Sequence, residues 1–352
     1  MRILIKMAIT LLTIIGLFIF SSILIGFMLS APSYQGEKTD HFNGKRFVNP
    51  SNAMAKGFKD LIKWAMNRQQ GPWEKIGQSN DNTFISMDSD SMARVYFVNH
   101  STFLIQLGNL NILTDPVWSN RVSPFKWLGP QRMRPPGIKF AELPDIHLVL
   151  ISHNHYDHLD VSTLIKIHKK FNPLIITPLG VSKLLLQKGI DNCIEMDWWQ
   201  NQKINDQSEI VCVPALHFSG RGTFDRDKTL WAGFIIKSTF GNIYFAGDTG
   251  YGNIFKQIGK EYGPINLAML PIGAYLPQWF MSPIHTSPDE AVKIHLDLQA
   301  DKSVAMHFGT FPLADDGMWQ PQEDLKKAKE KYQVENFYVL EEGDKILLEK
   351  SY

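Results

Sequence analysis

Cysteine is almost absent from this sequence of 352 residues, which contains only Cys193 and Cys212. Neither residue belongs to a Cys-x-x-Cys pair. Two cysteines provide neither a disulfide framework nor the four ligands of a zinc ribbon. We therefore expect both to be buried free thiols.

An excess of either charge is also absent. The 36 lysine and arginine residues stand against 35 aspartate and glutamate residues, which gives a formal net charge of +1. No dense basic block is interleaved with aromatic residues, so we expect no nucleic acid partner. A chain of this length without internal repeats or low-complexity runs fits one large catalytic domain with an appendage.

The N-terminus has no charged residue from Met7 to Gln35, and apolar residues dominate from Ala8 to Leu29. About 20 apolar residues cross a bilayer as a helix, whereas a signal peptide has an apolar region of roughly 7–15. Leu29-Ser30-Ala31 is a poor cleavage site because it begins with leucine. We therefore predict an uncleaved membrane anchor over residues 1–31. A buried core helix is the alternative.

Basic residues give a weak indication of orientation. Arg2 and Lys6 favour a cytoplasmic N-terminus. Lys38, Lys45 and Arg46 follow the apolar segment and weaken that indication. We expect the catalytic domain to lie outside the cytoplasm, in the periplasm.

The rest of the chain divides into a tether, residues 32–93, and a catalytic domain, residues 94–352. Apolar residues at helical spacing predict a short helix inside the tether, between residues 55 and 70. In the catalytic domain, apolar runs predict strands within 94–115 and over 146–151, 173–177, 209–214, 230–237, 242–246, 267–271 and 303–306. Amphipathic stretches predict helices over 160–171, 180–189, 253–262, 288–298 and 322–332. This mixture is typical of an α/β domain.

The stretch HNHYDH, from His153 to His158, places four ligand-type side chains directly behind the apolar strand 146–151. His153 and His155 are two residues apart and point to one side of an extended backbone. Asp157 and His158 are adjacent and can serve a neighbouring position. Zinc accepts imidazole nitrogen and carboxylate oxygen. One tight loop can therefore supply ligands to two metal ions.

This motif resembles the His-x-His-x-Asp-His signature of the metallo-β-lactamase superfamily. The resemblance implies an αβ/βα sandwich with two metal ions at the edges of its sheets and three further ligands. His217, Asp248 and His307 are the candidates, since each follows an apolar strand and they occur in the expected order. We therefore predict an α/β fold of the metallo-β-lactamase type, preceded by a transmembrane helix.

A closer resemblance runs from about Val95 to near the C-terminus. Stretches such as LGPQRMRPPG, EMDWWQ, FAGDTGYG, LPIGAYLPQWFM and HTSPDEAV look like N-acylphosphatidylethanolamine-hydrolysing phospholipase D and its bacterial relatives. The resemblance does not cover the apolar N-terminal segment.

This resemblance implies two zinc ions with Asp248 and a hydroxide between them. The first would be held by His153, His155 and His217, and the second by Asp157, His158 and His307. The nitrogen and oxygen ligands would also admit iron, manganese or cobalt.

The remaining histidines receive different assignments. His285, in SPIHTSPDE, matches a family histidine that engages the phosphate, with a polar residue outside a helix cap as the alternative. His100 lies in a family motif and is assigned a supporting or structural role. The predicted non-ligands are His41, His147, His168 and His295.

The implied reaction is attack of the bridging hydroxide on phosphorus, which releases phosphatidic acid and an N-acylethanolamine. Two metal ions clamp both ends of such a displacement, and no Gly-x-Ser-x-Gly elbow indicates a serine nucleophile. The candidate lipid contacts are Trp118, Tyr275, Leu276, Trp279 and Phe280, and Arg121 is a candidate for the headgroup. Core packing and pairing with carboxylates are the alternatives.

Other functions stay open at this point. The same site could hydrolyse a lactone, a β-lactam or another phosphodiester, because ligand spacing does not distinguish these bonds. A di-iron oxidoreductase would be expected to replace His155 by a carboxylate. A membrane-anchored binding protein on an inactive scaffold conflicts with the complete ligand set. The expected partners are a phospholipid substrate and the membrane, and the family resemblance also implies a homodimer.

Overall fold

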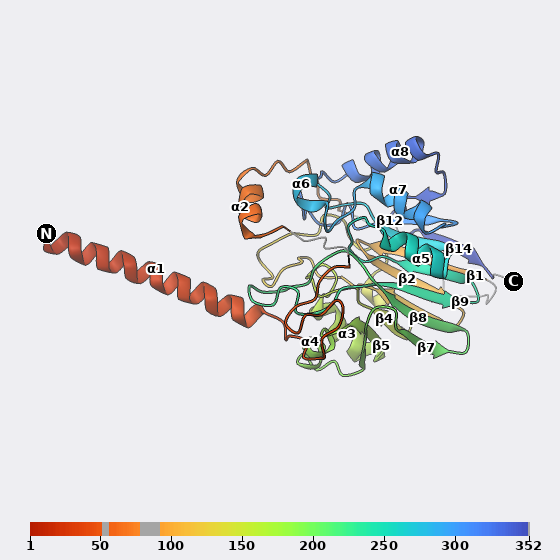
Figure 1. Cartoon of the computed structure of the whole chain (residues 1–352), viewed down its shortest axis with the longest axis horizontal. Coiled ribbons are helices and arrows are strands. Elements are labelled where there is room, and N and C mark those ends of the chain that lie inside the picture. Colours follow the sequence, from red (N-terminus) through yellow and green to blue (C-terminus); the bar gives the residue numbers. More distant parts are fainter. Residues whose placement is uncertain (51–55, 78–91, 351–352) are drawn as a thin grey trace.

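The computed structural model describes residues 1–50, 56–77 and 92–350. A long helix, α1 (Arg2–Leu29), projects from a rounded domain (Figure 1). Within the described residues, α1 is the one helix long and apolar enough to cross a membrane, judged by length and composition, and its most apolar stretch is not buried. The prediction of a long apolar N-terminal helix is confirmed, and its alternative as a buried core helix is wrong.

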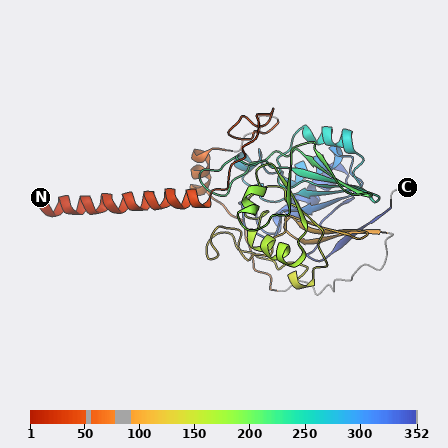
Figure 2. The same cartoon turned by 90° about the horizontal axis from the view of Figure 1, so that it is seen from below.

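Two seven-stranded sheets face each other (Figures 1 and 2). The first has the order β14-β1-β2-β3-β4-β5-β6. Its strands are β1 (Met92–Asn99), β2 (Thr102–Leu107), β3 (Leu110–Thr114), β4 (Leu148–Leu150), β5 (Leu174–Pro178), β6 (Cys193–Met196) and β14 (Lys345–Glu349). Pairing is antiparallel from β14 to β3 and parallel from β3 to β6.

The second sheet repeats this plan in the order β13-β12-β11-β10-β9-β8-β7. Its strands are β7 (Asn201–Asn205), β8 (Ser208–Val213), β9 (Gly233–Ser238), β10 (Gly241–Phe245), β11 (Leu267–Pro271), β12 (Ser303–Met306) and β13 (Phe337–Tyr338). Pairing is antiparallel from β7 to β10 and parallel from β10 to β13. Each sheet therefore has a parallel half whose carboxyl ends can supply a site.

Helices cover the outer faces of both sheets (Figure 1). On the first sheet these are α3 (Val161–Phe171) and α4 (Ser182–Leu186), and on the second they are α5 (Ile254–Tyr262), α7 (Pro288–Asp297) and α8 (Gln320–Tyr332). Amphipathic sequences explain this packing: Leu164 and Ile167 of α3 are buried against Val149 and Ile175 of the first sheet. Ser287 caps α7, because its side chain accepts from the backbone N–H of Glu290. The predicted α/β sandwich is confirmed.

The predicted tether contains the helix α2 (Phe58–Met66), which has no buried residue. The described residues of the tether before α2 pack against the catalytic domain, because Phe42 and Phe47 belong to the main hydrophobic core and are each only 2 % exposed. Residues 51–55 and 78–91 of the predicted tether lie outside the described residues. The division into anchor, tether and catalytic domain stays a prediction. Both cysteines are free, with Cys212 buried and Cys193 half-buried.

Candidate metal centre

The loop that carries HNHYDH is held by a buried strand. β4 lies between β3 and β5 in parallel pairing, and all three of its residues are buried. The chain leaves β4 at Leu150 and reaches His153 three residues later. His153 and His158 are buried, while His155 and Asp157 are half-buried. A rigid strand therefore delivers the motif to one edge of the first sheet.

The second sheet supplies the other candidates. His217 follows β8, Asp248 follows β10 and His307 follows β12. Parallel pairing of β10, β11 and β12 brings their carboxyl ends to one edge. The seven residues predicted as metal ligands consequently lie together between the two sheets, although they span much of the chain.

Three of these histidines converge as one group. Nε2 of His153 lies 2.8 Å from Nδ1 of His155, which lies 3.2 Å from Nε2 of His217. Their ligand atoms all lie within 4.8 Å of one another. This is the grouping that the resemblance implied for the first metal ion.

A second group contains Asp157, His158 and His307, with His100 as a fourth member. Oδ2 of Asp157 lies 3.3 Å from Nε2 of His158 and 3.3 Å from Nε2 of His307. It also lies 3.1 Å from Nε2 of the buried His100. His100 therefore contacts a predicted ligand directly, and its supporting or structural role stays a prediction.

Asp248 lies between the two groups. Its Oδ2 is 3.2 Å from Nε2 of both His158 and His307, and 3.7 Å from Nε2 of His217. The same oxygen is 3.8 Å from Nδ1 of His285. One carboxylate thus contacts members of both groups, which is the placement expected of a bridging ligand.

Burial and charge set the protonation of these groups. Burial raises the pKa of Asp248, but His158 and His307 outweigh it and hold that pKa well below its ordinary value. Burial lowers the pKa of His155 to about 4 and that of His217 well below its ordinary value. Ionised carboxylates and neutral imidazoles are the forms that bind cations.

His307 behaves differently from His155 and His217. Burial lowers its pKa, but the carboxylates of Asp248 and Asp157 outweigh burial and raise the pKa to about 9. The excess negative charge of the two aspartates is what a bound cation would offset, with release of the proton from the imidazole.

Several buried polar atoms of this cluster have no hydrogen-bond partner among the described residues, namely Nε2 of His158, Oδ1 of Asp248 and Nδ1 of His285. Buried polar atoms are normally satisfied, so such orphans call for an explanation. Coordination of cations would satisfy the first two. The donor set of nitrogen and oxygen without sulfur suits zinc, iron, manganese or cobalt. The residues present therefore fit a centre for divalent metal.

Comparison with known proteins agrees with this geometry. A family model described as "Beta-lactamase superfamily domain" matches residues 110–308. The chain belongs to the metallo-β-lactamase superfamily. Within the superfamily, an uncharacterized protein of Mycobacterium tuberculosis is 43% identical over 306 residues, which cover 84% of this chain and 81% of that protein.

Two further proteins are similar to this chain. N-acyl-phosphatidylethanolamine-hydrolyzing phospholipase D 1 of Caenorhabditis elegans is 33% identical over 329 residues, which cover 86% of this chain and 92% of that protein. The fold matches that of the metallo hydrolase Igni18 from Ignicoccus hospitalis with a TM-score of 0.58 and 24% identity, over 74% of this chain and 100% of that chain. The predicted resemblance to both superfamily and phospholipase family is confirmed. The chain is a metal-dependent hydrolase of the metallo-β-lactamase fold.

Sequence reasoning missed two residues that support this metallo-β-lactamase site. Asp115 accepts from the backbone N–H of Ser152 at 2.7 Å, and its Oδ2 lies 2.6 Å from Nδ1 of His158. The hydroxyl of Ser152 contacts Asp115 at 2.5 Å and Nδ1 of His153 at 2.9 Å. The position of Asp115 at the end of β3, beside β4, was a usable signal, because the ends of parallel neighbours meet.

Left-handed backbone marks the same site. His100, Asp115 and His307 have φ values of 49°, 33° and 60°. Residues other than glycine rarely adopt the left-handed region of backbone conformation, and those that do are often at functional sites. The fold therefore holds these three residues, at the candidate metal centre, in backbone conformations that cost free energy.

The predicted lipid contacts are less uniform. The Tyr275 hydroxyl contacts Asp324 at 2.5 Å, and the Phe280 ring stacks on Trp64. Trp118 donates from Nε1 to the carbonyl of Ile138, and Arg121 contacts Gly129 and Gln131 of its own loop. Leu276 is half-buried and Trp279 is exposed. Their role toward substrate stays a prediction.

The four predicted non-ligand histidines lie outside the metal groups. His295 pairs with Ser303 at 2.8 Å, His147 accepts from the backbone N–H of Asn111, and His168 faces Asp191. His41 contacts Asp40 and Asp197. Among the described residues, the groups able to hold a metal contain none of these four.

Proposed function

We propose that this protein is a membrane-anchored phosphodiesterase with two zinc ions that hydrolyses N-acylphosphatidylethanolamine-type phospholipids, in the manner of a phospholipase D. The placement of Asp248 between the two ligand groups supports the proposal, because its carboxylate would be available to ions held by both groups. Homology to a phospholipase D of this type supports the substrate class.

The chemistry divides between the ions and the chain. Bound divalent ions would lower the pKa of a water to about 7 and offset charge on phosphoryl oxygens. Asp248 would orient the water, since its carboxylate faces both ligand groups. The water oxygen would bond to phosphorus while the bond from phosphorus to the ethanolamine oxygen breaks, and the leaving oxygen would take up a proton equivalent to the one that the water loses.

His285 would bind the phosphate. Its Nδ1 is 3.8 Å from Oδ2 of Asp248, and the side chain keeps 12 % of its surface exposed. Burial lowers its pKa to about 4, so the ring is neutral at pH 7. A neutral imidazole donates one N–H, and a phosphoryl oxygen is a suitable acceptor.

The helix α1 would be the anchor, with its N-terminus in the cytoplasm and the catalytic domain in the periplasm. Its 28 residues make a helix about 42 Å long, which exceeds the roughly 30 Å of a bilayer core. Anchoring would keep the site at the surface that contains its substrate. Assembly as a homodimer stays a prediction.

The test is a panel of phospholipids with and without N-acyl groups, incubated with the purified protein and analysed by mass spectrometry. We expect phosphatidic acid and N-acylethanolamine from the N-acylated lipids, and loss of turnover in Asp248→Asn. Turnover that is unchanged in Asp248→Asn would contradict the metal-centred reaction. Hydrolysis of a simple phosphodiester or a lactone without lipid turnover would contradict the substrate class and keep the hydrolase.

A further inference from the structure

The end of α1 is fastened to the catalytic domain. The backbone N–H of Ala31 donates to Oδ2 of Asp225 at 2.8 Å, and the backbone N–H of Phe224 donates to the Ser30 hydroxyl at 3.1 Å. A Cβ at Gly222 would lie 2.6 Å from the carbonyl of Gly26 and 2.5 Å from the backbone nitrogen of Ser30. Only glycine allows this close approach of the helix end to the loop.

The loop that receives α1 also borders the metal site. Gly220 donates from its backbone N–H to Oδ1 of Asn154 at 2.8 Å. Arg221 donates to the carbonyls of Asn154 and Leu159 at 2.8 Å and 3.0 Å, and its guanidinium lies 3.8 Å from the ring centre of Tyr156. Asn154 and Tyr156 flank His155 in the metal-binding motif, so one loop joins the anchor to the ligands.

Residues 30–49, called here the strap, add a second connection. The backbone N–H groups of Tyr34 and Phe47 donate to the carbonyls of Lys228 and Asp227 at 2.9 Å and 2.8 Å. At the end of the strap, the Asn49 side chain donates to the carbonyl of His217 and accepts from its backbone N–H, at 2.9 Å and 3.1 Å. The strap therefore ends on the backbone of a predicted metal ligand.

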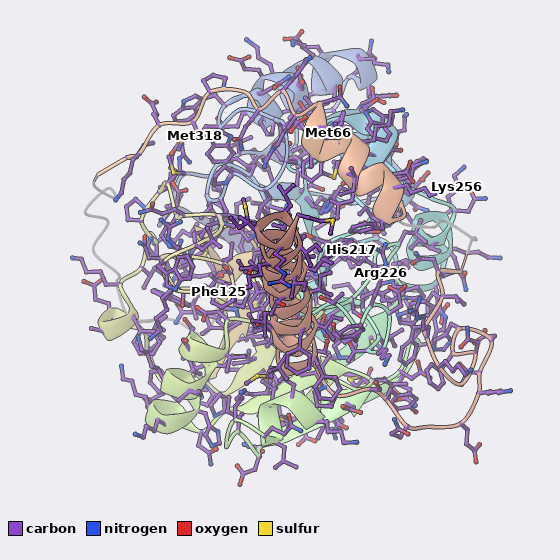
Figure 3. All side chains as sticks on the ribbon, turned by 90° about the vertical axis from the view of Figure 1, so that its left-hand side faces the viewer. Met66, Phe125, His217, Arg226, Lys256 and Met318 are labelled. Atoms are coloured by element: carbon purple, nitrogen blue, oxygen red, sulfur yellow. The ribbon has the colours of Figure 1, made fainter. Side chains whose placement is uncertain are left out.

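The surface around the end of α1 exposes several large apolar side chains. Single exposed apolar residues are common on soluble proteins, whereas a group of them marks an interaction surface. Figure 3 looks along α1 and shows Met66, Phe125 and Arg226 arranged around the helix. Trp127 and Leu128 contact Phe125, Phe224 lies beside Gly26 at the end of α1, and Trp279 lies beside Lys63 of α2, the helix that contains Met66. We call this the bilayer face and define it by Phe58, Met66, Trp127, Leu128, Phe224 and Trp279. All six are exposed, with Trp127 at 74 %, Met66 at 81 % and Phe224 at 43 %.

Cations accompany these apolar side chains. The Lys63 ammonium lies 4.9 Å from the ring centre of Trp279, and the guanidinium of Arg226 donates to the carbonyl of Lys56 at 3.4 Å. The Trp64 ring of α2 stacks on Phe280 with 5.1 Å between ring centres. Basic residues beside exposed apolar and aromatic ones are typical of a surface that lies in the interface of a phospholipid bilayer.

We propose that the strap holds the catalytic domain in one orientation, with the bilayer face lying in the lipid interface and the metal site opening toward the membrane. This rests on the proposed function in taking α1 as a membrane span. No flexible linker separates α1 from the catalytic domain, because the helix ends at Leu29 and the next two residues, Ser30 and Ala31, already form hydrogen bonds to the loop that contains Phe224 and Asp225. A phospholipid would then reach the site from the leaflet without crossing bulk water.

The test uses the full chain in phosphatidylethanolamine and phosphatidylglycerol vesicles. Single cysteines at Trp127→Cys and Phe224→Cys, in a Cys193→Ser background, carry an environment-sensitive fluorophore. Leu347→Cys is the control, because Leu347 is an exposed apolar residue on β14, at the end of the domain remote from α1 (Figure 1). We expect blue-shifted emission and quenching by spin-labelled lipid at both test positions and neither at the control. Equal solvent exposure at all three positions would overturn the proposal.

A kinetic measurement separates this surface from the reaction itself. In the Trp127→Glu, Phe224→Glu double variant we expect a several-fold lower rate on lipid in vesicles and an unchanged rate on a short-chain, monomeric N-acylated analogue. An equal loss on both substrates, or on neither, would contradict a role of this face in bilayer contact. If the unmodified protein hydrolysed neither substrate, the proposed function would fail, while the fluorophore measurement would still decide the orientation.

Discussion

Nδ1 of His158 lies 2.6 Å from Oδ2 of Asp115, and neither side chain is exposed to solvent. The carboxylate fixes the tautomer of His158, because Nδ1 carries the proton that Asp115 accepts and Nε2 is left to face Asp157 and Asp248. Such partners orient metal-binding histidines and raise their basicity. Burial raises the pKa of Asp115, and the neighbouring His158 opposes that rise.

Asp115→Asn should weaken metal binding by roughly 10–100-fold, which is the usual cost of losing such a partner. Competition with a chromogenic chelator measures the affinity. Asp145→Asn, which alters an exposed carboxylate just before β4, is the matched control and should bind metal like the unmodified protein. Equal affinity in Asp115→Asn and the control would refute the role assigned to Asp115.

His285→Gln should lower kcat by about 10²-fold, at the lower end of losses for a group that acts on the reacting atoms, and leave metal content unchanged. The reason is that His285 faces Asp248 at 3.8 Å but lies outside both predicted ligand sets. Elemental analysis and steady-state kinetics are measured together, with His168→Gln as the control. Loss of a metal ion from His285→Gln would show that His285 is a ligand instead.

Asn49→Ala should reduce the free energy of unfolding by about 1–3 kcal/mol, because it leaves both backbone groups of His217 without their partner. Denaturant unfolding in detergent measures the change. Asn43→Ala is the control, since Asn43 is exposed and its side chain bonds, among the described residues, within its own turn, to the backbone N–H groups of Lys45 and Arg46. An equally small decrease in the free energy of unfolding in both variants would contradict the role assigned to Asn49 in holding the strap against His217.

The stability that the strap contributes should depend on pH through His41. Burial lowers the pKa of His41, but hydrogen bonds to Asp197 and Asp40 outweigh burial and raise it above its ordinary value of 6.5. A raised pKa in the folded state means that the stabilisation is complete below pH 6.5 and is lost as pH rises through the folded pKa. The difference in melting temperature between the unmodified protein and His41→Gln should therefore be larger at pH 5.5 than at pH 9. A difference that grows with pH would have the wrong sign.

The parts of the molecule that could be predicted from sequence are those with a local signal. Apolar runs located β4, β11 and β12, and the ligand-type residues directly behind strands located the metal cluster. Parallel pairing then explains why His217, Asp248 and His307 meet, since strands of one sheet deliver their ends to one edge.

The parts that could not be predicted depend on distant contacts. β7 alternates between exposed and half-buried residues and has no apolar run, so its sequence did not predict its pairing with β8. β14 has only the short apolar run Ile346–Leu348, which does not indicate that its partner is β1, about 250 positions earlier in the chain. Asn49 contacts His217 across 168 positions of the chain. The strand expected from residue 230 begins at Gly233, because Leu230 and Ala232 bond instead to Leu179 and Ser152 in the loops around the site.

Incorporation of ¹⁸O from labelled water into the products tests the proposed reaction most directly. Attack of water on phosphorus places ¹⁸O in phosphatidic acid and none in N-acylethanolamine. We expect this labelling in the zinc-loaded protein and its loss after chelation or in Asp248→Asn. Label in the N-acylethanolamine would place the attack on carbon, and labelling that persists without metal would remove the metal centre from the reaction; either result would contradict the account.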